Sequence, residues 1–161
     1  MADGQILVSG NDGIYYLKLV GDVRVTLCTS LATYIETVFN SGDAKEVVVD
    51  LTQAEGADST TLGLLAKLAL YCRDSFGLVP TLLCSDPGLL NILHTMGLDE
   101  LYDVRNSDAD HRVLLEELQQ VVSDEEEIRE RVLEAHRLLV ALNPDNQKEF
   151  IDLIKELERQ D

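Results

Sequence analysis

Positive charge is scarce in this sequence. The 161 residues include 13 lysines and arginines against 30 aspartates and glutamates, which gives a formal net charge of −17 at pH 7. A chain this negative repels phosphate backbones and anionic lipid headgroups. We therefore predict no direct binding to nucleic acid, whereas a basic protein partner would be steered toward the chain.

Long apolar runs are also missing. No hydrophobic stretch approaches the roughly 18 residues that a transmembrane helix requires. The start of the chain, Met1 to Gln5, has neither the basic residues nor the apolar segment of a signal peptide. We expect no signal peptide and no membrane insertion.

Cysteine is limited to three residues, Cys28, Cys72 and Cys84, with no C-x-x-C pair. Each has Leu, Val or Tyr close by in the sequence, which favours buried free thiols that fill a core. Free thiols are typical of a reducing compartment. The sequence therefore predicts a cytoplasmic protein.

The patterns of catalytic and metal sites are absent from the sequence. His94, His111 and His136 have no Cys or His partner at metal-ligand spacing, and we interpret them as solvated or capping side chains. There is no G-x-S-x-G, no Walker A loop and no G-x-G-x-x-G. We predict no metal, no cofactor and no catalytic residue, and without a nucleophile–base pair we expect no enzyme.

The first 106 residues alternate between strand and helix patterns. The β-branched run Val47-Val48-Val49 is typical of a central strand buried on both faces. Thr26 is expected to cap the first helix, and Asp86-Pro87 to open the third. The predicted strands are 5–9, 14–20, 46–51, 78–84 and 101–104, and the predicted helices are 27–39, about 60–74 and 87–97. This β-β-α-β-α-β-α-β order predicts an α/β fold with a mixed sheet that begins with an antiparallel hairpin.

Residues 107–161 contain no glycine and no strand pattern, and we predict an all-helical extension. Its first helix is expected at 108–122. Ser123-Asp124-Glu125-Glu126 is interpreted as a capping box for the next helix, and Asn143-Pro144 as the start of the last. The sequence thus predicts a domain of residues 1–106, able to fold alone, and an extension of residues 107–161 that ends in a helical hairpin.

One segment, residues 47–65, carries the candidate site. A predicted strand ends in Asp50-Leu51, a predicted loop covers 52–57, and Asp58-Ser59 is expected to open the second helix. A serine at a helix start can cap the free N–H groups there. A phosphate at the same place would meet those N–H groups and the positive end of the helix dipole. Local chemistry alone leaves both interpretations of Ser59 open.

The segment resembles the STAS domain of anti-sigma factor antagonists. The resemblance rests on a strand V-V-x-D-L, a loop of about six residues and D-S-[ST]-x-L-G-x-L at a helix start. The order of elements, Pro80 in the fourth strand and Leu93-x-x-Met96-Gly97-Leu98 are also similar, so residues 5 to about 105 are covered. In that family the serine after the aspartate is phosphorylated, which implies Ser59 here, with Thr60 as the second choice. The family usually has Gly where this chain has Thr61.

The resemblance implies a partner-switching protein. Unphosphorylated, it would bind an anti-sigma factor, and a serine kinase and a PP2C-type phosphatase would control it. The implied binding residues are Gly56, Ala57, Asp58, Ser59, Thr60 and Thr61. The helical extension resembles a gammaproteobacterial subgroup that controls secretion, motility and biofilm formation. The alternatives are a STAS scaffold subunit of a lipid-transport ABC complex, a small-molecule-binding module and an enzyme.

Overall fold

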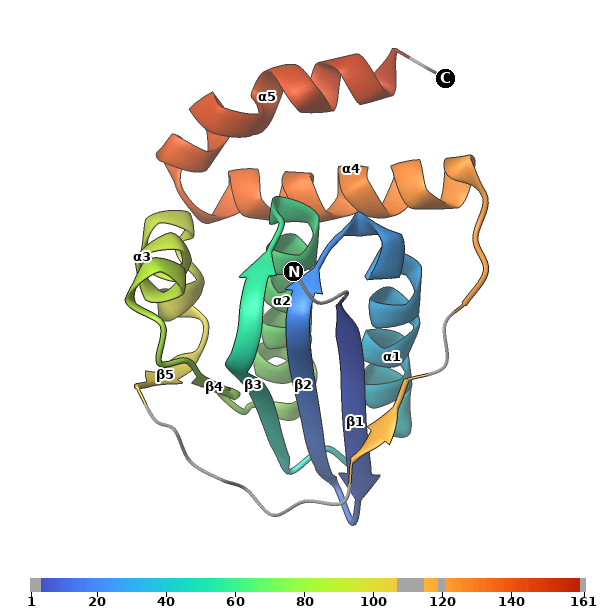
Figure 1. Ribbon diagram of the computed structural model, residues 1–161, viewed down its shortest axis with the longest axis vertical. Coiled ribbons are helices and arrows are strands. Elements are labelled where there is room, and N and C mark those ends of the chain that lie inside the picture. The colour runs from blue at the N-terminus through green and yellow to red at the C-terminus, as the bar shows by residue number, and fades with distance from the viewer. Residues whose placement is uncertain (1–3, 107–114, 119–120, 160–161) are drawn as a thin grey trace.

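The computed structural model describes residues 4–106, 115–118 and 121–159. In these residues a six-stranded sheet has the order β5-β4-β3-β2-β1-β6 (Figure 1). The strands are β1 Gln5–Asn11, β2 Ile14–Val23, β3 Glu46–Ala57, β4 Thr81–Leu83, β5 Asp103–Arg105 and β6 Glu116–Glu117. The helices are α1 Cys28–Ser41, α2 Ser59–Tyr71, α3 Pro87–Met96, α4 Glu125–Leu142 and α5 Pro144–Glu158.

The sheet is mixed, as predicted. β2, β3, β4 and β5 pair in parallel, whereas β1 pairs antiparallel with β2 on one side and β6 on the other. A tight turn joins β1 to β2, with Asp12 and Gly13 both at positive φ (55° and 83°). Glycine suits its position because a Cβ there would lie 2.5 Å from the Asp43 carbonyl oxygen. The predicted α/β fold, with a mixed sheet that begins with an antiparallel hairpin, is confirmed.

The sheet is larger than the sequence predicted. β3 continues through residues 52–57, which were expected to form a loop, because they pair with the end of β2 across two register shifts. The predicted helix at 108–122 is wrong in its described residues, 115–118 and 121–122, none of which is helical. Instead, Glu116–Glu117 pair with Leu7 and Val8, where β1 would otherwise present unpaired backbone groups. Residues 108–114 and 119–120 of that prediction lie outside the described residues.

Two helix caps and the start of one strand differ from the predictions. Thr26 does not cap α1, because residues 25–27 form a 3₁₀ turn and the cap position is Leu27, with no side-chain bond. The cap of α4 is Asp124, one residue later than expected, and its carboxylate accepts the Glu127 N–H at 2.8 Å. β4 begins at Thr81, so Pro80 precedes the strand instead of lying in it. The predicted starts of α3 at Pro87 and of α5 at Pro144 are confirmed.

The main core lies between the sheet and the helices α1 and α2, which lie behind the sheet in Figure 1. All three cysteines are buried free thiols in this core, as predicted. A smaller cluster of Tyr16, Val48 and Leu83 packs with Leu115 apart from it. Asp50 is only 2% exposed, and its carboxylate accepts bonds from the Tyr16 hydroxyl and from Thr52. The aspartate of the V-V-V-D-L run is therefore a satisfied structural group.

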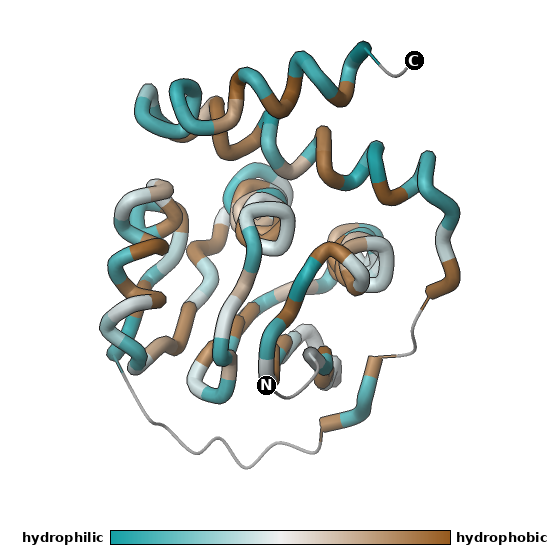
Figure 2. Tube along the Cα trace, turned by 45° about the horizontal axis from the view of Figure 1, so that its top comes forward, coloured by the Kyte–Doolittle hydropathy of each residue, from teal (hydrophilic) through white to brown (hydrophobic). Residues whose placement is uncertain are grey.

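The hairpin of α4 and α5 lies across one end of this layer, where β3 ends and α2 begins (Figure 1). α4 packs on α2 and α1, and α5 packs on α4. Both helices carry hydrophobic and hydrophilic stretches in alternation (Figure 2). The hydrophobic positions include Ala135, Leu139 and Phe150, which belong to the same core cluster as α2. The extension is thus continuous with the core of the sheet domain.

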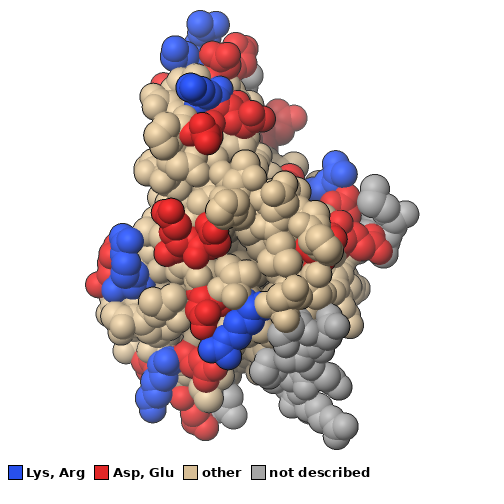
Figure 3. All heavy atoms as spheres, turned by 90° about the vertical axis from the view of Figure 1, so that its left-hand side faces the viewer, with Lys and Arg blue, Asp and Glu red and all other residues tan. Residues whose placement is uncertain are grey.

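Acidic side chains occur in several groups on the face that carries α3, with basic side chains beside some of them (Figure 3). Several of the few cations form ion pairs with neighbouring carboxylates, such as Arg105 with Asp103 and Arg137 with Glu158. No helix in the described part of the chain is long and apolar enough to cross a bilayer.

Candidate functional site at the start of α2

Asp58 organises the start of α2. Its Oδ1 atom accepts from the Thr61 backbone N–H and from the Thr61 hydroxyl, both at 2.9 Å. Its Oδ2 atom accepts from the Val25 N–H at 2.8 Å, which ties α2 to the segment that leads into α1. Of the two interpretations left open for Ser59, the one as an N-cap is therefore wrong: Asp58 is the N-cap and Ser59 is the first helical residue.

Thr61 fills the place where the resembling family usually has glycine. The residue is 1% exposed, and its hydroxyl also lies 3.3 Å from the Val23 carbonyl oxygen. The extra side chain is thus accommodated by two partners, Asp58 and Val23, instead of distorting the turn. The departure from the family pattern leaves the helix start regular.

Ser59 bonds to a residue far along the chain. Its Oγ atom lies 2.7 Å from Nε2 of His136 in α4, and Nδ1 of the same ring lies 2.6 Å from the Val132 carbonyl oxygen. A carbonyl only accepts, so Nδ1 carries a proton, and in the neutral ring Nε2 is then the acceptor. The Ser59 hydroxyl therefore donates to His136.

The interpretation of His136 as a solvated or capping side chain is wrong. The residue is 1% exposed and its ring packs edge-on against Phe150, with 4.9 Å between the ring centroids. A signal was present in the sequence: His136 follows Ile128 and Val132 at helical spacing, on the apolar face of α4. By contrast, His94 is exposed at the end of α3 beside Asp99, as predicted. His111 lies outside the described residues.

The six predicted site residues lie together at one end of the sheet. Gly56 and Ala57 end β3, and Asp58 and Ser59 are half-buried at the start of α2. Thr60 and Thr61 are buried, with exposed fractions of 4% and 1%. In this conformation Ser59 is thus the more accessible of the two predicted phosphate acceptors.

One stripe along α2 contacts α4. Ser59 meets His136, and a Cβ on Gly63 would collide with the Ala135 carbonyl oxygen. Lys67, a further turn along, forms an ion pair with Glu134 at 2.8 Å. Burial alone would lower the pKa of Lys67, but its bond to Glu134 and the charge of that carboxylate outweigh this and raise the pKa. The backbones of α2 and α4 are thus in contact beside Ser59.

A serine that donates to an imidazole is also the arrangement of a nucleophile and its base. No nucleophile–base pair was expected from the sequence, whereas the structure places the Ser59 hydroxyl within hydrogen-bonding distance of an imidazole. However, His136 is 1% exposed and its second nitrogen bonds to a helix carbonyl instead of a carboxylate. The described residues form no group of three or more metal-binding side chains. The geometry is that of a packed contact between helices.

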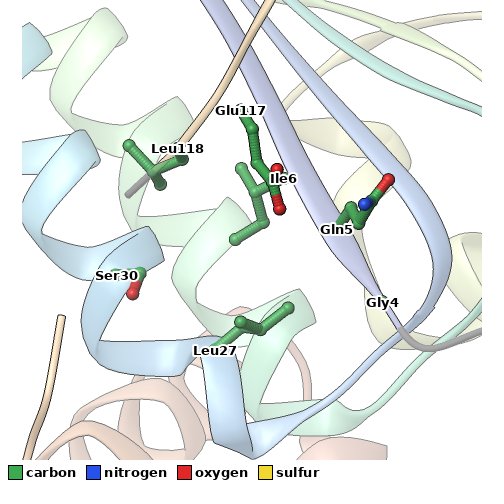
Figure 4. Close-up of a pocket in the computed structure, with 7 residues that line it drawn as sticks. All are labelled: Gly4, Gln5, Ile6, Leu27, Ser30, Glu117 and Leu118. Carbon is green, nitrogen blue, oxygen red and sulfur yellow. The ribbon is translucent and has the colours of Figure 1, made fainter. Parts of the chain in front are cut away.

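A hollow of about 490 Å³ lies apart from these residues. It opens between the start of β1, the first part of α1 and the end of β6 (Figure 4). Its lining consists of Gly4, Gln5, Ile6, Leu27, Ser30, Glu117 and Leu118. None of the six predicted site residues lines it, so it does not belong to the candidate site.

Solved structures of anti-sigma factor antagonists share this fold. One, from Mycobacterium paratuberculosis, has a TM-score of 0.56 at 21% identity, covering 66% of this chain and 88% of its own. Another, the Bacillus cell fate determinant SpoIIAA in its phosphorylated form, has a TM-score of 0.52 at 15% identity, covering 79% and 98%. No protein-family model and no curated protein matches the chain. The chain therefore has the fold of the STAS anti-sigma factor antagonists.

Proposed function

We propose that this protein is an anti-sigma factor antagonist controlled by phosphorylation of Ser59. The observation that carries the proposal is the position of Ser59, the first residue of α2, directly after the capping Asp58 and the end of β3. A hydroxyl at this place stands at the positive end of the helix dipole. The fold, shared with anti-sigma factor antagonists, gives this position its functional context.

Unphosphorylated, the end of β3 and the first turn of α2 bind an anti-sigma factor, which then releases its sigma factor. Phosphorylation adds about −1.5 to −2 charges. Asp58 is adjacent, and its carboxylate already accepts three hydrogen bonds from protein groups. The new charge therefore lies beside an existing one, and an interface that fits a hydroxyl would have to desolvate it. Phosphorylation thus releases the anti-sigma factor.

The chemistry of the switch belongs to other proteins. A serine kinase adds the phosphate and a PP2C-type phosphatase removes it, while this chain serves as substrate and binding partner. A cytoplasmic location and the subgroup that controls secretion, motility and biofilm formation remain predictions that accompany this proposal. The alternative of a lipid-transport scaffold predicts co-purification with an ATPase instead of an anti-sigma factor or kinase.

Isothermal titration of the Ser59→Ala and Ser59→Asp variants against the co-purified anti-sigma factor tests the proposal. Both variants lose the hydroxyl that donates to His136, so their difference isolates the added charge. One poorly paired interfacial charge of about 2–3 kcal/mol would make Ser59→Asp bind roughly 30- to 150-fold more weakly than Ser59→Ala.

The matched control is Ser85→Asp, which places the same charge before the capping Asp86 of α3 and should leave the affinity nearly unchanged. Phosphate should map to Ser59 in protein from the native cell. Equal affinities of the two Ser59 variants, with phosphate mapped to another residue, would falsify the assignment.

A further inference from the structure

Ser59 is covered from within the chain. Its hydroxyl proton is held by His136, a residue of α4 that is itself 1% exposed. The distance from Oγ to Nε2 is 2.7 Å, which is a hydrogen-bond length with no room for another group between the atoms. A kinase has to bring the serine oxygen up to a nucleotide phosphate. While the bond to His136 persists, the serine oxygen is directed to α4 instead of toward such a phosphate.

The cover extends beyond one hydrogen bond. Ser59, Gly63 and Lys67 are spaced four residues apart, so they form a single stripe on α2, and α4 contacts all of it. α4 therefore cannot free the Ser59 end of the stripe by a side-chain rotation alone. Because the Gly63 position leaves no space between the two backbones, access to Ser59 requires α4 to move.

The two helices of the hairpin also hold each other. α5 packs on α4, with Phe150 and Ile154 buried and Arg129 donating to the Leu157 carbonyl at 2.8 Å, and these contacts persist if both helices lift together. Two amides attach the hairpin to α3. Asn143 donates to the Thr95 carbonyl at 3.2 Å, and Asn146 donates to the Met96 carbonyl at 2.8 Å. Water can replace such bonds once the hairpin has left.

We infer that the α4–α5 hairpin is an internal cover that occupies the partner-binding surface at Ser59, so that the kinase and the anti-sigma factor reach this surface only when the hairpin swings away. The inference rests on the proposed function, and it names the regulation of the same site. In the closed form the Ser59 hydroxyl donates a hydrogen bond to His136; in the open form the same hydroxyl and the Gly63 stripe are presented to a partner. Any ligand that prefers the open form shifts the population toward it.

Thiol labelling of the full-length chain measures this opening without any partner. Ser59→Cys supplies the reporter, and Ser75→Cys, at an exposed position after α2, gives the rate of free access. The background is low because the three native cysteines are buried, and burial raises the pKa of the Cys72 thiol to about 11. We expect a maleimide to label Ser59→Cys at least about tenfold more slowly than Ser75→Cys.

Gly63→Ala is expected to displace α4 from α2 without changing residue 59. The added methyl meets the Ala135 backbone, while alanine is the better helix former, so α2 itself should not be weakened. In the Ser59→Cys background it should raise the labelling rate about tenfold or more. The matched control is Gly88→Ala, the same change within α3, where the nearest atom lies 3.7 Å from the new Cβ and the rate should not change.

Equal labelling of Ser59→Cys and Ser75→Cys would overturn the inference. A second outcome would also overturn it: Gly63→Ala speeds hydrogen exchange of the α4 backbone amides, yet the thiol introduced by Ser59→Cys is still labelled slowly. If the native cysteines of Gly63→Ala also react, the variant is unfolded, and Asn146→Ala, which removes the bond to Met96, then decides by the same criterion. The labelling experiment contains no partner, so its result is independent of the titration. Fast labelling of Ser59→Cys together with different affinities of the Ser59 variants would refute only the cover. Slow labelling together with equal affinities would refute only the proposed function.

Discussion

The hydrogen bond between Ser59 and His136 should give a coupling free energy that a double-mutant cycle can measure. In Ser59→Ala the donor is lost, and in His136→Ala the acceptor and a buried ring are lost. The second change should cost more, about 2–4 kcal/mol of unfolding free energy, because it leaves a cavity beside Phe150 as well as an unpaired hydroxyl. Ser59→Ala should cost about 1 kcal/mol.

The double variant should be more stable than the sum of the two single changes implies. Once one partner has gone, removing the other no longer breaks a hydrogen bond, so the coupling energy should be about 0.5–1.5 kcal/mol. Urea unfolding followed by circular dichroism is a suitable assay for a chain without tryptophan. For a chain of this size, 1 kcal/mol corresponds to a shift in Tm of about 2–4 °C. Strictly additive effects would show that the two side chains do not interact in solution, and α4 would not then cover Ser59 as described.

Other changes probe separate parts of the structure. Asp58→Ala removes a cap and the tie to the α1 segment, so it should lower the unfolding free energy by about 2 kcal/mol, as urea titration can check, whereas Asp58→Asn should lose less. The bond to Asp99 and its charge raise the pKa of His94, so this ion pair should be complete below the ordinary histidine pKa and lost as pH rises through the raised one; an NMR titration of His94 that is unchanged by Asp99→Asn would contradict this. Asn146→Ala, which removes the bond from the hairpin to the Met96 carbonyl, should increase the affinity for the anti-sigma factor in isothermal titration, and an affinity at or below the parent value would count against the cover. A chain that ends at Asn106 is still predicted to melt cooperatively, although it loses the α4 and α5 members of the main core cluster; a broad, non-cooperative melt would mean that the hairpin completes the domain.

The order of elements could be predicted from the sequence because hydrophobic periodicity is a local property. The Val47-Val48-Val49 run forms the middle of the sheet, and Pro87 begins α3. The far end of β3 and the strand β6 could not be predicted, because each depends on pairing with a strand distant in the chain. Glu116–Glu117 has no strand pattern of its own and becomes a strand only where it meets β1.

Only the part of the candidate site that is encoded locally could be predicted from the sequence. Asp58-Ser59 could be placed at a helix start from the residues alone, but which of the two caps the helix depends on backbone angles that either residue can adopt. His136 was missed because its partner lies 77 positions away in the chain, and no local pattern joins them. Its place on the apolar face of α4 was the only available hint.

The outer strands of the sheet also bear on how partners recognise the protein. β5 has three residues and β6 has two, and Asp103, Arg105, Glu116 and Glu117 make both strands mostly charged. Edge strands that are short and charged offer few backbone hydrogen-bonding groups to which another chain could add a strand. Such edges disfavour pairing between the sheets of two copies of the protein. In the proposed switch, partners would then contact side chains on the helices, where a single hydroxyl can govern their binding.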